Sequence, residues 1–323
     1  MRARTVVAAV VVGLVLLAAP ALYLTQPLPM PFRSRAEAPE VSPARLEAHV
    51  RALSEEFVPR DFLHPENLDR AAAYVAGEFE AAGGAVSYQD FPAGSATYRN
   101  VIAAFGPDTP ERIVVGAHYD AAGPHPAADD NASGVAGLIE LAHLLGRARL
   151  PVRVEMVAYP LEEPPFFRTP QMGSAVHAAS LRRGGVRVRA MLALEMIGYF
   201  TDAPGSQAFP LGILRAFYPS HGNFVLVAGH MGQGRLVRRV KRAMGGGSAL
   251  PVRSINAPRW IPGIDFSDHV NYWDAGYDAV MITDTAFYRN PYYHGPRDTA
   301  DTLDYRRMAM VVQGVYAAVL ALA

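Results

Sequence analysis

Apolar and polar positions follow two periods along this chain, one typical of strands and one typical of helices. Short apolar runs alternate with segments in which apolar residues recur every three or four positions. The runs predict strands over residues 101–105, 112–117, 152–159, 186–194, 223–228 and 279–283. The longer period predicts helices over residues 66–82, 135–147, 174–183, 235–244 and 305–320, and another helix that begins at Pro43 after the capping residue Ser42. This order indicates one α/β domain with a mostly parallel sheet.

The first 42 residues depart from this pattern. Arg2 and Arg4 precede an apolar run over residues 5–24 that contains no charged residue. A positive flank before an apolar run is typical of an export signal, and about 20 apolar residues can also span a bilayer. We therefore expect residues 1–24 to be a signal peptide or a membrane anchor, residues 25–42 a Pro-rich linker, and residues 43–323 a single domain. That domain is expected to be exported, either membrane-anchored outside the cytoplasm or periplasmic or secreted.

Composition narrows the chemistry. The 323 residues include 30 Lys and Arg, 30 Asp and Glu, and no Cys. A neutral chain gives no electrostatic reason to expect a nucleic-acid partner. Without cysteine, disulfides and thiolate chemistry are excluded, so any metal ion must be bound by His and carboxylate side chains.

Histidines and acidic residues gather where the predicted strands end. The residues concerned are His118 and Asp120, the pair Asp129-Asp130 before a predicted helix, the pair Glu162-Glu163, Glu195, and His294 beyond the strand 279–283. In open α/β sheets, ligands bind at the carboxyl ends of the strands. The sequence therefore predicts that these side chains meet at one edge of the sheet.

Each of these segments also has an ordinary structural interpretation. Asp129-Asp130 could simply cap the helix that follows. His118 and Asp120 could be a surface pair, although a metal-bound histidine usually donates its second ring N–H to such a carboxylate. The pair Glu162-Glu163 is harder to explain without chemistry, because adjacent carboxylates repel each other unless a cation or a shared proton compensates.

Five motifs in order carry a family resemblance. They are His118-Tyr-Asp120, Ala128-Asp-Asp130-Asn-Ala-Ser-Gly134, Glu162-Glu163, Leu194-Glu195-Met-Ile-Gly198 and Tyr293-His294-Gly. Together with Ser267-Asp268-His269 and the segment from Asp298 to Asp301, this set resembles the co-catalytic dizinc aminopeptidases typified by bacterial leucyl aminopeptidase. The resemblance runs from about residue 45 to the C-terminus, and several spaced motifs in one order are strong evidence.

The resemblance implies a fold, a reaction and a set of roles. The fold would be a three-layer α/β/α sandwich with a mostly parallel mixed sheet, as in zinc exopeptidases. Two zinc ions would be held by Asp130 as the bridging ligand, by His118 and Glu195 at one site, and by Glu163 and His294 at the other. Glu162 would act as general base on a hydroxide that bridges the metals, with Asp120 as a second catalytic residue. The family often has Asp where this chain has Glu195. It also implies a cis peptide bond between Asp130 and Asn131.

An aminopeptidase acts on peptides with a free N-terminus and needs a pocket for the first side chain. Loop residues beside the ligand segments are possible pocket residues, namely Phe166, Phe167, Met172, Tyr199, Phe200, Tyr288 and Tyr292. The segment 201–220, which is rich in Pro, Gly and aromatic residues, is expected to be a surface excursion near the site.

Three other functions stay open at this point. Glutaminyl cyclases resemble this fold and these ligands but cyclise an N-terminal glutamine. Some receptor ectodomains share the fold without catalysis, although they are expected to lack some ligands. A carboxypeptidase would require a basic carboxylate-binding group, for which Arg168, Arg259 and Arg289 are candidates.

Overall fold

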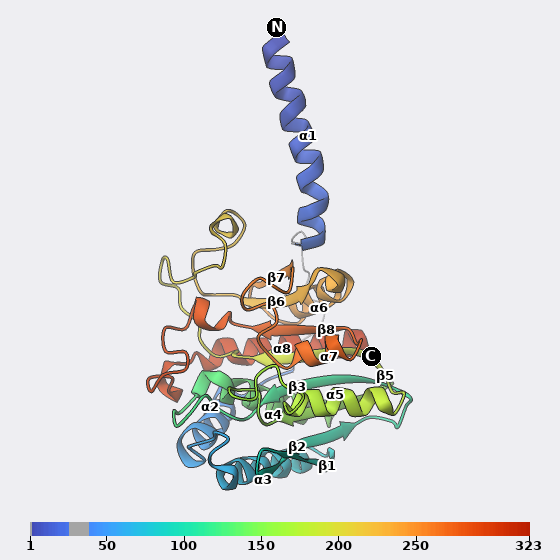
Figure 1. Ribbon diagram of the computed structural model, residues 1–323, viewed down its shortest axis with the longest axis vertical. Coiled ribbons are helices and arrows are strands. Elements are labelled where there is room, and N and C mark those ends of the chain that lie inside the picture. The colour runs from blue at the N-terminus through green and yellow to red at the C-terminus, as the bar shows by residue number, and fades with distance from the viewer. Residues whose placement is uncertain (1, 26–38) are drawn as a thin grey trace.

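The computed structural model describes residues 2–25 and 39–323, with side chains described for residues 5–19 and 39–323. Helix α1 (Arg2–Thr25) extends away from the folded body (Figure 1). Within this described part, no helix combines the length and the hydropathy that crossing a bilayer requires. The expected signal or anchor at residues 1–24 lies partly outside the described side chains, and most of the expected linker lies outside the described residues. Both, together with export of the domain, stay predictions.

One eight-stranded sheet forms the centre of the molecule, in the order β1-β2-β4-β3-β5-β8-β6-β7. The strands are β1 (Ala85–Ala93), β2 (Ala96–Phe105), β3 (Glu111–His118), β4 (Arg153–Tyr159), β5 (Arg187–Glu195), β6 (Val225–His230), β7 (Val252–Ala257) and β8 (Ala279–Thr283). The four central strands run parallel to one another, as do β6 and β7. The pairs β1–β2, β2–β4 and β6–β8 are antiparallel. The sheet is thus mixed and mostly parallel, as predicted.

Helices cover both faces of this sheet and complete the predicted three layers (Figure 1). One face carries α2 (Pro43–Arg51), α3 (Pro65–Ala81), α4 (Gly134–Leu145), α6 (Gly234–Gly247) and α8 (Tyr305–Leu322). The other face carries α5 (Gly173–Arg183) and α7 (His269–Asp274), which pack against each other. Each face has its own apolar core, so burial on both sides explains why the central strands are almost wholly apolar.

The sequence did not predict β1, β7 or α7. In β1, which lies at one edge of the sheet, most side chains are exposed, so the apolar alternation that marks a strand is weak. At the other edge, β7 contains Arg253, Ser254 and Asn256. Helix α7 has only six residues, too few for a helical period to appear. The strands β2 and β3 follow each other in the chain, but β4 lies between them in the sheet.

The sheet brings the ends of its four central strands together. His118 ends β3 and is in register with Tyr159 of β4, and Glu195 ends β5 in register with Thr283 of β8. Because parallel strands end at the same edge, the residues that follow them share one side of the molecule.

Candidate metal centre

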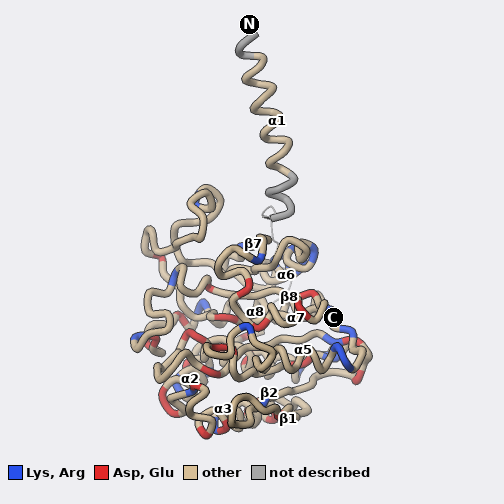
Figure 2. The backbone as a smooth tube through the Cα atoms, viewed as in Figure 1, with Lys and Arg blue, Asp and Glu red and all other residues tan. Residues whose placement is uncertain are grey.

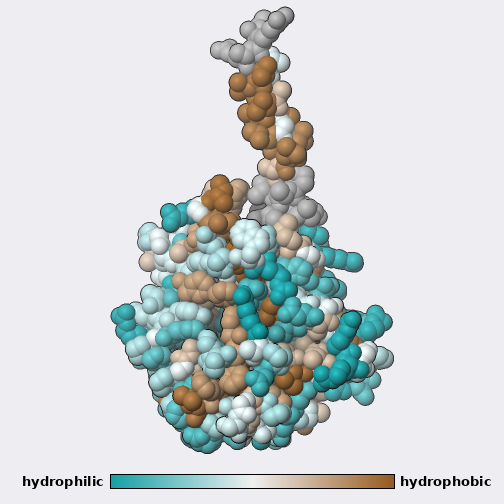
Figure 3. Space-filling view, viewed as in Figure 1, coloured by the Kyte–Doolittle hydropathy of each residue, from teal (hydrophilic) through white to brown (hydrophobic). Residues whose placement is uncertain are grey.

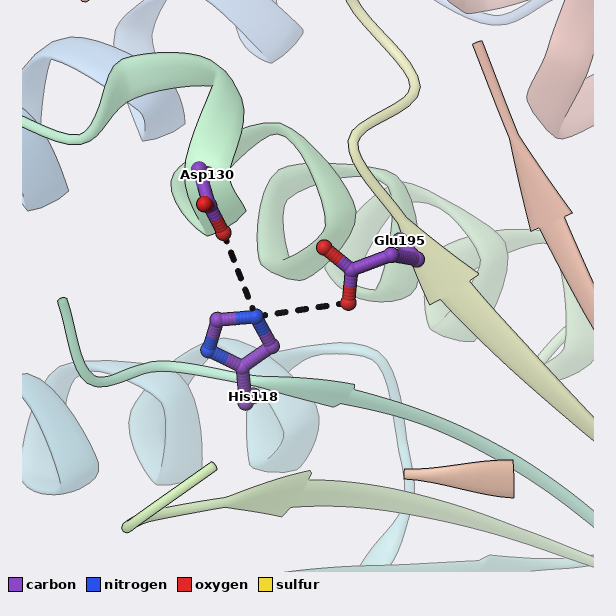
Figure 4. Close-up of side chains that lie close together, drawn as sticks. All are labelled: His118, Asp130 and Glu195. Carbon is purple, nitrogen blue, oxygen red and sulfur yellow. Dashed lines mark ion pairs between the residues drawn. The ribbon is translucent and has the colours of Figure 1, made fainter. Parts of the chain in front are cut away.

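His118 lies between two carboxylates at the end of β3 (Figure 4). Its Nε2 atom is 3.4 Å from Oδ1 of Asp130 and 3.4 Å from Oε2 of Glu195. Ser267 donates a hydrogen bond of 2.7 Å to the same oxygen of Glu195 and so orients it. All of these side chains are buried. Among the described residues, neither ring nitrogen of His118 has a hydrogen-bond partner, which leaves Nε2 free to face a cation.

Asp130 joins this group to a second one. Its other oxygen, Oδ2, lies 3.0 Å from Nε2 of His294, and the same nitrogen lies 3.2 Å from Oε1 of Glu163. Two sets of three potential ligands result, one of His118, Asp130 and Glu195 and one of Asp130, Glu163 and His294. Glu162 lies with His118 and Glu163 in a further group of this kind. The structure thus brings together all six residues that the sequence singled out for metal binding and proton transfer.

Two supporting carboxylates, Asp120 and Asp298, hold the acidic pairs in place. The two oxygens of Asp120 accept hydrogen bonds from the backbone N–H groups of Glu162 (3.1 Å) and Glu163 (3.0 Å). Oδ1 of Asp120 also lies 3.4 Å from Nδ1 of His118, on the side of the ring away from the ligand carboxylates. Asp120 therefore holds the glutamate pair by hydrogen bonds and lies directly beside the imidazole.

Asp298 makes the equivalent contacts to the other pair. Its oxygens accept hydrogen bonds from the backbone N–H groups of Asp129 (3.0 Å) and Asp130 (3.1 Å). Each acidic pair is thus held at two consecutive backbone amides by one buried carboxylate, which sets the direction of its side chains.

The turn between Asp129 and Gly134 is joined to the end of β5. Its peptide bond between Asp130 and Asn131 is cis, as the resemblance implied. Asn131 Nδ2 donates to the carbonyl oxygen of Leu194 (2.9 Å), and Asn131 Oδ1 accepts from the backbone N–H of Met196 (3.0 Å). A Cβ atom at Gly134 would lie 2.6 Å from the oxygen of Leu194, so only glycine permits this approach. The segments that carry Asp130 and Glu195 are therefore fixed to each other.

Strained backbone accompanies the ligand segments. Leu161, Met196 and His294 all have positive φ, at 63°, 45° and 54°. A non-glycine residue in this region costs about 1–3 kcal/mol and persists only when its surroundings impose it. His294 is itself a candidate ligand, and Leu161 and Met196 lie next to Glu162 and Glu195, so the strained positions coincide with the candidate site.

The electrostatics of the centre favour a bound positive charge. Burial raises the pKa of Glu162 well above its usual range, and burial followed by the charge of Asp130 raises the pKa of Glu163 to about 7. Burial lowers the pKa of His294, but its hydrogen bonds to Asp130 and Glu163 outweigh burial and raise it to about 10. The protein alone thus favours protons on these side chains. A divalent cation would reverse that preference, because it stabilises carboxylates and neutral imidazoles as ligands.

Arg60 places a fixed positive charge behind the centre. Its side chain is fully buried. The guanidinium donates hydrogen bonds to the backbone carbonyls of Leu53, Tyr119, Pro126 and Ala127. Burial lowers its pKa to about 10, which leaves it charged at neutral pH, and the charges of Asp120 and Asp298 oppose this shift. Arg60 therefore holds the segment between Asp120 and the pair Asp129-Asp130, and its positive charge offsets part of the negative charge of the carboxylates around it.

An apolar cavity opens beside Glu195. Its lining includes Phe209, Leu214, Phe224, Ile264, Phe266 and Met281. Phe209 and Leu214 come from the segment 201–220, which the sequence predicted to be a surface loop near the site. The cavity thus adjoins one potential metal ligand and offers mainly apolar contacts.

Only some of the expected pocket residues lie in or near this cavity. Tyr288 lines the cavity beside Glu195. Phe167 lies behind the lining and packs edge-to-face against Phe266, with ring centroids 5.7 Å apart. Phe200 is buried and lies under the guanidinium of Arg289.

The other expected pocket residues lie outside the lining of this cavity. Phe166 packs edge-to-face against Phe62 at 5.6 Å. Met172 is fully buried, and Tyr199 and Tyr292 form an edge-to-face pair at 6.2 Å.

Sequence reasoning missed several residues that shape the centre. Ser267 and Asp298 belong to the motifs that carry the resemblance. Their hydrogen bonds, however, join residues that lie more than 70 positions apart in the sequence, and no local pattern predicts such pairs. Arg60 and the cavity residue Phe224 lie in segments with no motif, so no sequence signal could have identified them.

Comparisons with known proteins show which family and which structures this chain is similar to. Residues 100–319 match the model of peptidase family M28. YfbL of Escherichia coli (strain K12) is 50% identical over 282 residues, which cover 85% of this chain and 86% of YfbL. Two solved structures share the fold at lower identity. The LapA aminopeptidase of Legionella pneumophila has a TM-score of 0.67 and 18% identity, covering 88% of this chain and 72% of LapA. The glutaminyl cyclase of Fimbriiglobus ruber has a TM-score of 0.67 and 22% identity, covering 91% of this chain and 100% of the cyclase.

Proposed function

Since the chain belongs to peptidase family M28, we propose that it is a zinc-dependent aminopeptidase that removes N-terminal residues from peptides. The observation that carries this proposal is the position of Asp130, whose two carboxylate oxygens face two different histidines. His118, Asp130 and Glu195 would hold one zinc ion, and Asp130, Glu163 and His294 the other.

The residues present suit zinc. Imidazole nitrogen and carboxylate oxygen are ligands that zinc accepts, and the buried ring nitrogens of His118 have no partner among the described residues. Zinc bound here would supply Lewis-acid activation of the attacking water and of the scissile carbonyl.

Glu162 is the proposed general base. It is buried beside His118 and Glu163 and belongs to neither of the two ligand sets that share Asp130. Its side chain would take a proton from the attacking water and pass it to the leaving amine. Asp120, whose carboxylate holds the backbone N–H of Glu162, would act as a positioning residue and not as a proton carrier.

The cavity beside Glu195 would receive the first side chain of the substrate. Its apolar lining favours a large apolar residue such as Leu, Phe or Met over a charged or small one, because burying apolar surface there is favourable. The carboxylates at the edge of the centre would accept the positively charged α-amine. Together these features support cleavage of one residue from a free N-terminus.

A panel of chromogenic aminoacyl substrates tests this function. We expect hydrolysis of leucyl, phenylalanyl and methionyl substrates, loss of activity after chelation, recovery with zinc, and no hydrolysis of N-acetylated versions. A glutaminyl substrate separates the main alternative, because a glutaminyl cyclase would release a pyroglutamyl product without hydrolysing the other substrates. Zinc binding with neither reaction would contradict the proposal and support a non-catalytic binding domain.

A further inference from the structure

One segment of this neutral chain is strongly basic. Residues 203–264 contain eight Lys and Arg residues and no Asp or Glu, so the rest of the chain carries an equal excess of negative charge. This segment forms β6, α6 and β7 and the loops around them, which together make one end of the sheet. In Figure 2, Lys and Arg mark this end at α6 and beside β7.

Helix α6 presents a row of arginines to solvent. Arg235, Arg239 and Arg242 are exposed and follow one another at intervals of four and three residues, which places them on one side of the helix. Leu236 and Val240 are buried on the opposite side. The basic side is therefore a surface of the domain and not part of its core.

Apolar side chains project from the loops of the same segment. Trp260, in the loop after β7, is 73% exposed, and Ile213, in the short helical turn Gly212–Ala216, is 66% exposed. Leu211 and Phe217, on either side of that turn, are also exposed. Figure 3 shows a hydrophobic tip that projects from the body beside α1. Exposed large apolar residues at loop tips indicate a contact surface and not a packing role.

Helix α1 leaves the body at this end. It contacts β7, the edge strand of the sheet, and extends outward from there (Figure 1). Its described side chains include exposed valines and leucines, among them Val10, Leu14 and Leu17. Basic, aromatic and aliphatic surfaces thus occupy one end of the molecule.

We propose that this end of the folded domain docks on an anionic lipid surface. The arginines of α6 would contact lipid phosphates, since basic residues are attracted to anionic membrane surfaces. Trp260 and Ile213 would enter the interface between headgroups and acyl chains, where tryptophan is favoured. A soluble acidic partner would account for the arginines but not for apolar side chains at the loop tips and along α1.

The two tryptophans of the chain provide the test. Trp260 is exposed and Trp273 is buried, so a change in emission on docking reports on Trp260. The full-length protein is reconstituted with phosphatidylcholine vesicles or with vesicles that also contain phosphatidylglycerol. With the anionic vesicles, we expect a blue shift, protection from iodide and quenching by brominated lipid, all reversed by high salt. Trp260→Phe should abolish this response.

Charge variants identify the surface. Replacing Arg235, Arg239 and Arg242 together by Gln should weaken docking by about 10²-fold, given the usual contribution of basic residues near a membrane. A matched control replaces Arg147, Arg149 and Arg183, which are exposed but lie outside the basic segment, and should leave docking unchanged.

Three results would overturn the proposal. Trp260 could remain equally accessible to iodide with neutral and anionic vesicles. The α6 variant and its control could respond alike. Soluble polyglutamate could protect Trp260 as the anionic vesicles do, which would assign the surface to an acidic polypeptide.

Discussion

Replacing Asp120 by Asn would keep the shape of this side chain while removing its charge and one of its acceptors. In the wild type, its two oxygens accept hydrogen bonds from the backbone N–H groups of Glu162 and Glu163, at 3.1 and 3.0 Å. An amide offers only one oxygen, so one of these N–H groups would face an NH₂ group. The same change removes the carboxylate that lies 3.4 Å from Nδ1 of His118.

The contacts set the expected size of the effect. A hydrogen bond to a charged group contributes about 1.5–3 kcal/mol, so the Asp120→Asn variant with zinc bound should lose about 2 kcal/mol of unfolding free energy. For a domain of this size, that corresponds to a fall of about 3–4 °C in Tm. If His118 is a zinc ligand as proposed, loss of the carboxylate behind it should weaken zinc binding by about 10–100-fold. The displaced Glu162 should also lower kcat.

Competition with a chromophoric chelator, thermal unfolding and peptide hydrolysis measure the three effects. Asp298→Asn is the matched control, because Asp298 holds two backbone amides in the same way but does not touch Glu162. Excess zinc should restore the hydrolysis rate of Asp298→Asn but not that of Asp120→Asn. Unchanged zinc affinity together with wild-type kcat at saturating zinc in Asp120→Asn would refute the positioning role.

Three further predictions concern the base, the cavity and acid stability. Glu162→Gln should keep both metals and lose about 10²–10⁴-fold in kcat, whereas Glu163→Gln should lose metal on dialysis and regain part of its rate with excess zinc; the opposite pattern of metal content would reverse the two roles. Ala228→Phe, which fills the lining of the cavity beside Glu195, should lower kcat/KM about 10-fold more for leucyl than for alanyl substrates; equal losses would place the side-chain pocket elsewhere. Burial, followed by the charge of Arg112, lowers the pKa of His177 to about 3, so the stability it contributes is complete above about pH 6.5 and falls as the pH drops toward 3. Urea unfolding of His177→Gln between pH 5 and 6.5 should therefore show a smaller loss of stability than the wild type, and parallel curves would contradict the shifted pKa.

The sequence predicted those elements whose burial gives a clear period. The five residues of β8 are all buried, and its predicted and observed bounds coincide. The edge strands β1 and β7 were missed for different reasons. Most side chains of β1 are exposed, so it needs no apolar pattern, whereas β7 is mostly buried but its apolar run is interrupted by Arg253, Ser254 and Asn256. The pairing of β2 with β4 also lay beyond the sequence, since no local signal indicates which strands become neighbours.

The candidate ligands could be predicted because strand ends in a parallel sheet share one edge. His118 and Glu195 end neighbouring strands, so their approach follows from the fold class alone. The walls of the cavity could not be predicted in this way. Phe209, Phe224 and Ile264 all lie in loops, and their meeting depends on loop conformations that no periodicity describes.

Charge balance explains why the centre needs more than its ligands. In the proposed centre, three ligand carboxylates, two divalent cations and one hydroxide would be neutral together, but further buried acids, among them Asp120, Asp298 and Glu162, lie in the same region. Arg60, fully buried beside them, offsets one of these charges. Burial, followed by the charge of Asp129, raises the pKa of Asp298 to about 8, and burial raises that of Glu162, so protons can offset the others. In the proposed centre, cations and protons would therefore compete for the same buried oxygens, and a side chain outside both ligand sets, such as Glu162, could exchange its proton while the metals stay bound.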